Sequence, residues 1–127
     1  MIDRESEEPV YAQVARRLRE LCSDGRLAPG AALPAVRTLA SDLGVNLNTV
    51  ARAYRLLADE GFLTIRGRSG VEVAAPARRA ASTDAIEPHL RDLRIALARL
   101  RQSGIDEKRM RAITDREIGL LFEERKG

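Results

Sequence analysis

The chain of 127 residues is 44% hydrophobic and 32% charged, which suits one domain of ordinary size, or a small domain with an appendage. It has no run of 18 apolar residues and no basic start followed by an apolar stretch, so we expect neither a membrane span nor a signal peptide. It has only one cysteine, so we expect no disulfide framework. These observations together predict a cytoplasmic protein. The net charge of +3 is the sum of −3 in residues 1–8, +3 in residues 9–75 and +3 in residues 76–127. This basic excess is too small to establish a nucleic-acid partner by itself.

The first predicted helix follows an acidic N-terminus. Residues 1–8 are expected to be disordered. Pro9 suits the first position of a helix, and Gly25 supplies a left-handed cap at its end. Apolar residues at spacings of three and four predict one buried face of this helix: Tyr11, Val14, Leu18 and Leu21.

Two short helices joined by a tight glycine turn are predicted next. The first runs from Val36 to Leu43 and stops at Gly44, and Asn46 caps the second. The buried face of the second helix is predicted to hold Leu47, Val50, Tyr54 and Leu57. Its opposite face carries amide and guanidinium groups on Asn48, Arg52 and Arg55. This pattern is typical of a helix-turn-helix whose second helix lies in the DNA major groove.

A β-hairpin is predicted after the third helix. Residues 62–66 and 71–73 alternate apolar and polar side chains, as strands do. The turn between them contains Gly67, Arg68 and Gly70, which gives the hairpin a basic tip. The predicted fold class is therefore α+β, with a winged helix-turn-helix of three helices and a two-stranded hairpin over residues 9–75.

The rest of the chain is predicted to be a linker and a helical hairpin. Residues 76–85 are small, contain proline and lack periodicity. Spacings of four and three then predict a coiled-coil-like seam: Ile86, Leu90, Leu93, Leu97 and Leu100. Gly104 ends this helix, and a further helix capped by Asp106 adds apolar positions at Met110, Ile113, Ile118, Leu121 and Phe122. Two helices of this size bury little surface alone, so we predict that residues 86–127 dimerise with a second copy.

Several residues have an ordinary structural interpretation beside a functional one. Arg52 and Arg55 could be solvated charges, and only their place on the second helix of a helix-turn-helix favours DNA contact. His89 has no metal-ligand cluster around it, so we infer no zinc or other metal. Cys22 is interpreted as a partly buried thiol rather than a redox sensor. No catalytic constellation is visible in the sequence, so neither an enzyme nor a cofactor is expected.

The order of these motifs resembles the GntR family of bacterial transcription regulators. The resemblance runs from residues 9–14 (PVYAQV) through 25–30 (GRLAPG) and Leu33-Pro34 to the end of the hairpin. The segment 44–50 (GVNLNTV), followed by Ala53-Tyr54, is most similar to the YtrA subfamily, in which a short helical C-terminal region mediates dimerisation.

The resemblance also implies roles for individual residues. It implies that Arg37 contacts the phosphate backbone, that Asn48 and Thr49 reach bases and phosphates, and that the wing glycines let the tip approach the minor groove. The predicted DNA-binding residues are Arg37, Asn46, Asn48, Thr49, Arg52, Arg55, Gly67, Arg68 and Gly70.

Three positions depart from the family pattern. Many relatives have arginine where this chain has Ala51, so Arg52, about 100° further round the helix, is the candidate to take over that base contact. Ala35 replaces a common capping serine. Val71-Glu72 replaces the usual threonine–aromatic pair, and we expect Glu72 to repel phosphate.

The sequence thus predicts a homodimeric transcription regulator that represses from a palindromic operator. The family suggests its own promoter or a transporter operon as the target. The predicted partners are double-stranded DNA, a second copy and an unknown small-molecule effector, with no membrane partner. Two alternatives remain open: a winged helix that binds an acidic protein, and the DNA-binding remnant of a larger effector-sensing regulator.

Overall fold

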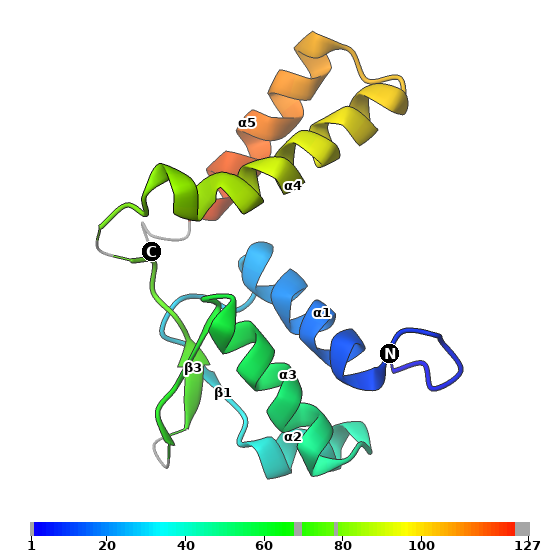
Figure 1. Cartoon of the computed structure of the whole chain (residues 1–127), viewed down its shortest axis with the longest axis vertical. Coiled ribbons are helices and arrows are strands. Elements are labelled where there is room, and N and C mark those ends of the chain that lie inside the picture. The colour runs from blue at the N-terminus through cyan, green and yellow to red at the C-terminus, as the bar shows by residue number, and fades with distance from the viewer. Residues whose placement is uncertain (1, 68–69, 78, 124–127) are drawn as a thin grey trace. The chain divides into compact units, whose positions relative to one another are not determined.

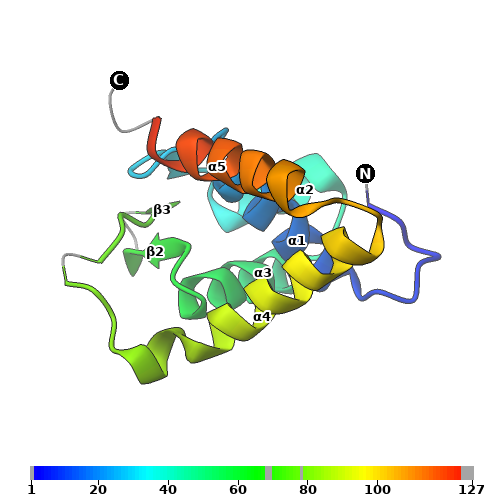
Figure 2. The ribbon, with the colours of Figure 1, turned by 90° about the horizontal axis from the view of Figure 1, so that it is seen from above.

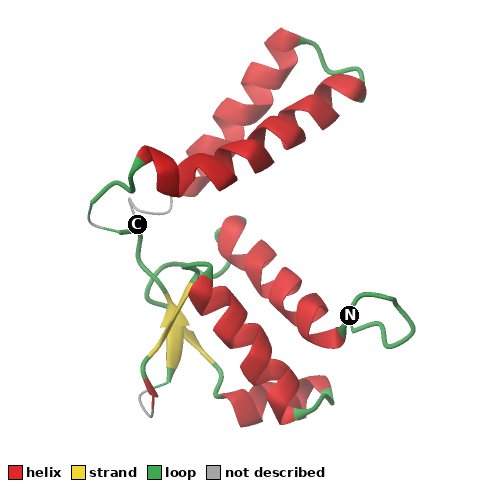
Figure 3. Ribbon diagram, viewed as in Figure 1, coloured by secondary structure: helices red, strands yellow, loops and turns green. Residues whose placement is uncertain are grey.

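The computed structural model describes residues 2–67, 70–77 and 79–123. The chain divides into two units, Met1–Pro76 and Ala77–Gly127. The first unit contains α1 (Val10–Ser23), β1 (Ala32–Leu33), α2 (Val36–Leu43), α3 (Leu47–Asp59), β2 (Leu63–Ile65) and β3 (Val71–Val73), and the second contains α4 (Thr83–Gln102) and α5 (Glu107–Glu123) (Figures 1 and 3). None of the described helices is long and apolar enough to span a bilayer.

The helix-turn-helix has the ends that its sequence predicts. Gly44 closes α2 in the left-handed conformation, with φ of 68° and ψ of 36°. The side chain of Asn46 caps α3 by accepting a hydrogen bond of 2.7 Å from the backbone N–H of Asn48. Ala35 precedes α2 and offers no side-chain cap, so the first N–H groups of this helix lack the partner that a serine would supply.

The wing contains one strand more than the sequence predicts. β1, β3 and β2 form an antiparallel sheet in that order, with β3 in the centre. Leu63 pairs with Val73 and Ile65 with Val71, as in the predicted hairpin, while Ala32 of β1 pairs with Glu72. β1 has only two residues, too few for a period-two pattern to be recognised, and it is held by backbone bonds such as Val73 N–H to Ala31 O at 2.9 Å.

The core of the first unit lies where α3 meets α1 and the sheet. On α3, Val50, Ala53, Tyr54 and Leu57 are at most 1% exposed. α1 adds Val14 and Ala15, and the sheet adds Leu63, Val71 and Val73.

One residue of the predicted buried face of α3 lies outside the core. Leu47 is 36% exposed, although the sequence placed it on the buried face. Leu47 lies about 60° round the helix from Val50, and Ala53 occupies the opposite edge of the buried stripe. The stripe is therefore centred further from Leu47 than the pattern suggested.

The N-terminal segment, expected to be disordered, is held against α1 by a buried glutamine. Gln13 is 3% exposed. Its Nε2 donates to the carbonyl oxygens of Asp3 at 2.7 Å and Glu8 at 2.9 Å, and its Oε1 accepts from the Asp3 N–H at 2.7 Å. A buried amide needs such partners, and here the backbone of the segment supplies them.

The second unit is a helical hairpin of α4 and α5, and Figure 2 shows the two helices diverging from the turn that joins them. α4 begins at Thr83, whereas the sequence predicted a linker through residue 85. The Ser82 hydroxyl caps it by accepting from the Ala85 N–H at 3.2 Å, and this polar first turn carries no apolar periodicity that would reveal it. Asp106 begins α5 by accepting from the Arg109 N–H at 2.8 Å, which confirms its predicted capping role.

Candidate nucleic-acid interface

The outer face of α3 presents the polar groups that the sequence predicts. Asn48, Arg52 and Arg55 are exposed at spacings of four and three, opposite the buried stripe. Thr49 is half-buried at the edge of this face. The carbonyl oxygen of the Asn46 side chain is occupied by capping, which leaves its NH2 group free to donate to a ligand.

The arginines of α2 and α3 have no acidic partner among the residues that the structure describes, whereas those of α1 have them. Arg37, on the first turn of α2, and Arg55 form no ion pair or hydrogen bond with any described residue. On α1, by contrast, Arg16 pairs with Glu8 and Glu20, and Arg19 donates to both Glu60 carboxylate oxygens at 2.8 and 2.9 Å. The guanidinium donors of Arg37 and Arg55 are therefore available to an external anion such as phosphate.

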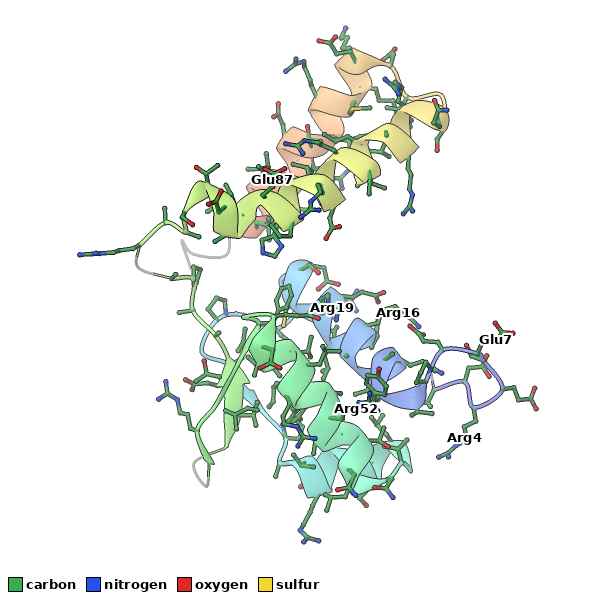
Figure 4. The ribbon with its side chains drawn as sticks, viewed as in Figure 1. Arg4, Glu7, Arg16, Arg19, Arg52 and Glu87 are labelled. Atoms are coloured by element: carbon green, nitrogen blue, oxygen red, sulfur yellow. The ribbon has the colours of Figure 1, made fainter. Side chains whose placement is uncertain are left out.

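Arg52 has an aromatic partner that the sequence analysis missed. Its Cζ lies 3.7 Å from the centre of the Tyr11 ring, a cation–π contact between α3 and α1. Figure 4 shows Arg52 on the flank of α3 that faces α1. The two residues are 41 positions apart, so no periodicity links them, and the sequence pattern placed Tyr11 on an apolar face only.

The wing turn depends on two glycines with positive φ. Gly67 has φ of 57° and Gly70 has φ of 105°, a region that favours glycine, and the Arg66 N–H donates to Gly70 O at 2.8 Å. Arg68, predicted at the tip, lies outside the described residues. Glu72 does not present a bare negative charge as expected, because Arg66 donates to its carboxylate from Nε at 2.8 Å.

A further arginine lies beside the turn of the helix-turn-helix. The guanidinium of Arg4 donates to the backbone carbonyl of Gly44, between α2 and α3. Figure 4 shows Arg4 on the N-terminal segment. Because these residues are 40 positions apart, the sequence offered no signal for the contact.

A buried tyrosine ties the two helices of the motif together. The Tyr54 hydroxyl donates to the carbonyl oxygen of Pro34 at 2.8 Å, just before α2. Burial raises the pKa of Tyr54 to about 12.

The single cysteine, Cys22, is half-buried, as the sequence predicts. Burial raises the pKa of its thiol, and the negative charge of Asp24 raises it further. A raised pKa disfavours the reactive thiolate.

The predicted dimerisation residues fall into two groups in the second unit. Leu90, Leu97, Leu100, Met110 and Ile113 are half-buried between the helices, while Ile86, Leu93, Ile118, Leu121 and Phe122 are exposed. An open groove of about 550 Å³ runs along the hairpin, with Leu93, Leu97, Met110, Ile118 and Leu121 in its lining.

In the part of the chain that the structure describes, no group of three His, Cys, Asp or Glu residues could hold a metal ion.

Comparison with known proteins decides the family. A family model of bacterial regulatory proteins, the gntR family, matches residues 10–73, from the start of α1 to the end of β3. The chain belongs to the GntR family. The matched residues contain all the elements of the winged helix-turn-helix described above.

Relatives of the YtrA type are among the similar proteins. This GntR chain is 46% identical over 68 residues to the HTH-type transcriptional repressor YtrA of Bacillus subtilis, covering 53% of this chain and 52% of that one. It is 40% identical over 73 residues to the HTH-type transcriptional regulator Rv1152 of Mycobacterium tuberculosis, covering 58% and 60%. The matched segments thus span roughly half the length of these curated relatives.

Two solved structures extend the comparison. YtrA from Sulfolobus acidocaldarius, a GntR-family transcription factor, is 35% identical with a TM-score of 0.62, covering 94% of this chain and 96% of that one. The likeness therefore includes the α4–α5 hairpin, and the chain is YtrA-like in architecture. The DNA-binding domain of AraR, solved in complex with operator ORE1, is 27% identical with a TM-score of 0.52, covering 58% of this chain and 90% of that domain.

Proposed function

We propose that the chain is a homodimeric transcriptional repressor that binds a two-fold symmetric DNA operator. The observation that supports this most is the exposed amide and guanidinium face of α3, beside arginines without acidic partners among the described residues. Such a face suits phosphate and base edges, and α3 is the recognition helix of the motif. The repressor role follows the name of the Bacillus subtilis relative.

Within the proposed interface, each group of residues has its own role. Arg37 fixes the register on a backbone phosphate, and Asn48, Thr49 and Arg52 contact bases in the major groove. Arg55 extends this face toward the flanking phosphates. The wing turn between Gly67 and Gly70, with Arg68, approaches the adjacent minor groove.

The proposed dimer forms through the α4–α5 hairpin. None of its described residues is fully buried within one chain, and Leu93, Ile118 and Leu121 are 50%, 54% and 55% exposed in or beside one apolar groove. A second copy of the same hairpin covers such a groove with a self-complementary surface. Two-fold symmetry then requires an inverted repeat, and we expect its half-sites roughly one helical turn, about 34 Å, or more apart.

Selection from random duplex DNA tests this proposal. The full chain is incubated with a random library, and the retained sequences are compared after repeated rounds. We expect inverted repeats, with two chains bound per duplex by sedimentation. The DNA upstream of the chain's own gene is the first natural operator to test. Retained sequences without symmetry, or binding by one chain per site, would contradict the dimeric operator, and no retention at low salt would favour a protein-binding role instead.

A further inference from the structure

The contact between Tyr11 and Arg52 joins the recognition helix to a different helix of the domain. At 3.7 Å between Cζ and the ring centre, the guanidinium lies at stacking distance above the aromatic face. Arg52 is nevertheless exposed, and it forms no ion pair or hydrogen bond with a described residue. The face of the guanidinium is therefore engaged, while the N–H donors in its plane remain free.

Tyr11 is itself held in place by the packing of α1. It lies in the first turn, where the Pro9 carbonyl accepts from the N–H groups of Ala12 and Gln13 at 3.0 and 3.1 Å. Gln13 is buried and anchored to the N-terminal segment by three hydrogen bonds. At its other end, α1 is joined to the end of α3 by the bidentate pair of Arg19 and Glu60. The backbone that carries the Tyr11 ring is thus anchored at both ends of α1.

We propose that Tyr11 is a positioning residue for sequence recognition, whose ring holds Arg52 so that its in-plane donors meet the edge of a guanine. A bidentate contact to guanine needs two parallel N–H donors in one plane, and stacking restricts the guanidinium without using them. Part of the rotamer entropy that Arg52 loses on binding is then lost already in the free protein. The inference rests on the proposed function, because it deepens the role given there to Arg52.

The test compares variants of the full chain on two DNAs. Tyr11→Leu removes the aromatic face but keeps an apolar side chain, and Tyr11→Phe is the matched control that keeps the ring. Each is measured on the operator selected by the wild type and on scrambled DNA of equal length, over a salt series. Circular dichroism and thermal unfolding check that each variant is folded. The same Tyr11→Leu change is also made in an Arg52→Ala background.

We expect Tyr11→Leu to weaken operator binding about two- to tenfold, because the free Arg52 side chain then loses on binding the rotamer entropy that the stack had already removed. Scrambled-DNA binding and the salt slope should not change, because no phosphate contact is lost. Tyr11→Phe should behave as the wild type, and Tyr11→Leu should have no effect in the Arg52→Ala background.

Three results would overturn the inference while leaving the proposed function intact: an equal loss on both DNAs, a loss that persists without Arg52, or tighter operator binding by Tyr11→Leu. The last would mean that the stack competes with DNA for Arg52. A wild-type chain that selects no sequence would contradict the proposed function itself, and this inference with it.

Discussion

Replacing Tyr54 by phenylalanine removes one hydroxyl from the centre of the helix-turn-helix. The ring is 1% exposed and keeps its packing in the variant, so no cavity forms. What is lost is the 2.8 Å hydrogen bond to the Pro34 carbonyl, which anchors the chain just before α2. A buried hydrogen bond of this kind contributes about 1 kcal/mol to the free energy of unfolding. For a domain of this size, about 1 kcal/mol corresponds to a fall of about 4–8 °C in Tm.

The same hydroxyl should make the wild type lose stability as the pH rises above about 10. The folded-state pKa of Tyr54, about 12, exceeds that of an unfolded tyrosine, about 10, so the unfolded chain releases the proton first. The stabilising contribution is therefore complete below about pH 10 and is lost as the pH rises toward about 12. Tyr54→Phe lacks this group, so its stability should fall less over that range.

Urea unfolding of the two proteins, at about pH 8 and about pH 11, measures both effects. At about pH 8 the wild type should have a higher free energy of unfolding than Tyr54→Phe. At about pH 11 this difference in the free energy of unfolding should be smaller. Equal stabilities at the lower pH, or parallel losses on raising the pH, would refute the role given to this hydroxyl.

Three further predictions follow from the wing, from α2 and from the second unit. Glu72→Gln releases Arg66 from its ion pair, so binding should tighten on operator and scrambled DNA alike. The slope of log affinity against log salt concentration should steepen by about one. An unchanged slope would show that Arg66 does not reach DNA. Ala35→Ser supplies the missing cap of α2 and should raise the free energy of unfolding by about 1 kcal/mol in urea titration, whereas a loss of stability would contradict the capping assignment. Leu93→Glu should convert the dimer to a folded monomer in sedimentation, while Gln102→Glu, a matched charge on the same helix, should not.

The sequence predicts the helix-turn-helix well, because its signals are local. Gly44 and Asn46 mark the ends of α2 and α3 through backbone conformation and side-chain capping, which depend only on neighbouring residues. The polar face of Asn48, Arg52 and Arg55 follows from helical spacing in the same way.

The features that the sequence does not predict depend on long-range contacts or on very short elements. The support of Arg52 by Tyr11 and the bond from Arg4 to Gly44 join residues about 40 positions apart. β1 has two residues and exists only because β3 offers it an edge. The neutralisation of Glu72 by Arg66 depends on the pairing of β2 with β3, and the hairpin pattern alone cannot show which charge takes which partner.

Binding to the DNA just upstream of the chain's own gene, measured with random competitor DNA over a salt series, tests the central claim most directly. We expect the wild type to resist competitor and to protect two symmetric half-sites. Arg52→Ala should lose about 1–3 kcal/mol on this DNA and little on random DNA, and Arg37→Ala should weaken binding to both. Specific wild-type binding with an equal loss on both DNAs for Arg52→Ala would contradict base recognition by Arg52 and make it a phosphate contact. Failure of the wild type to bind any DNA at low salt would contradict the account as a whole.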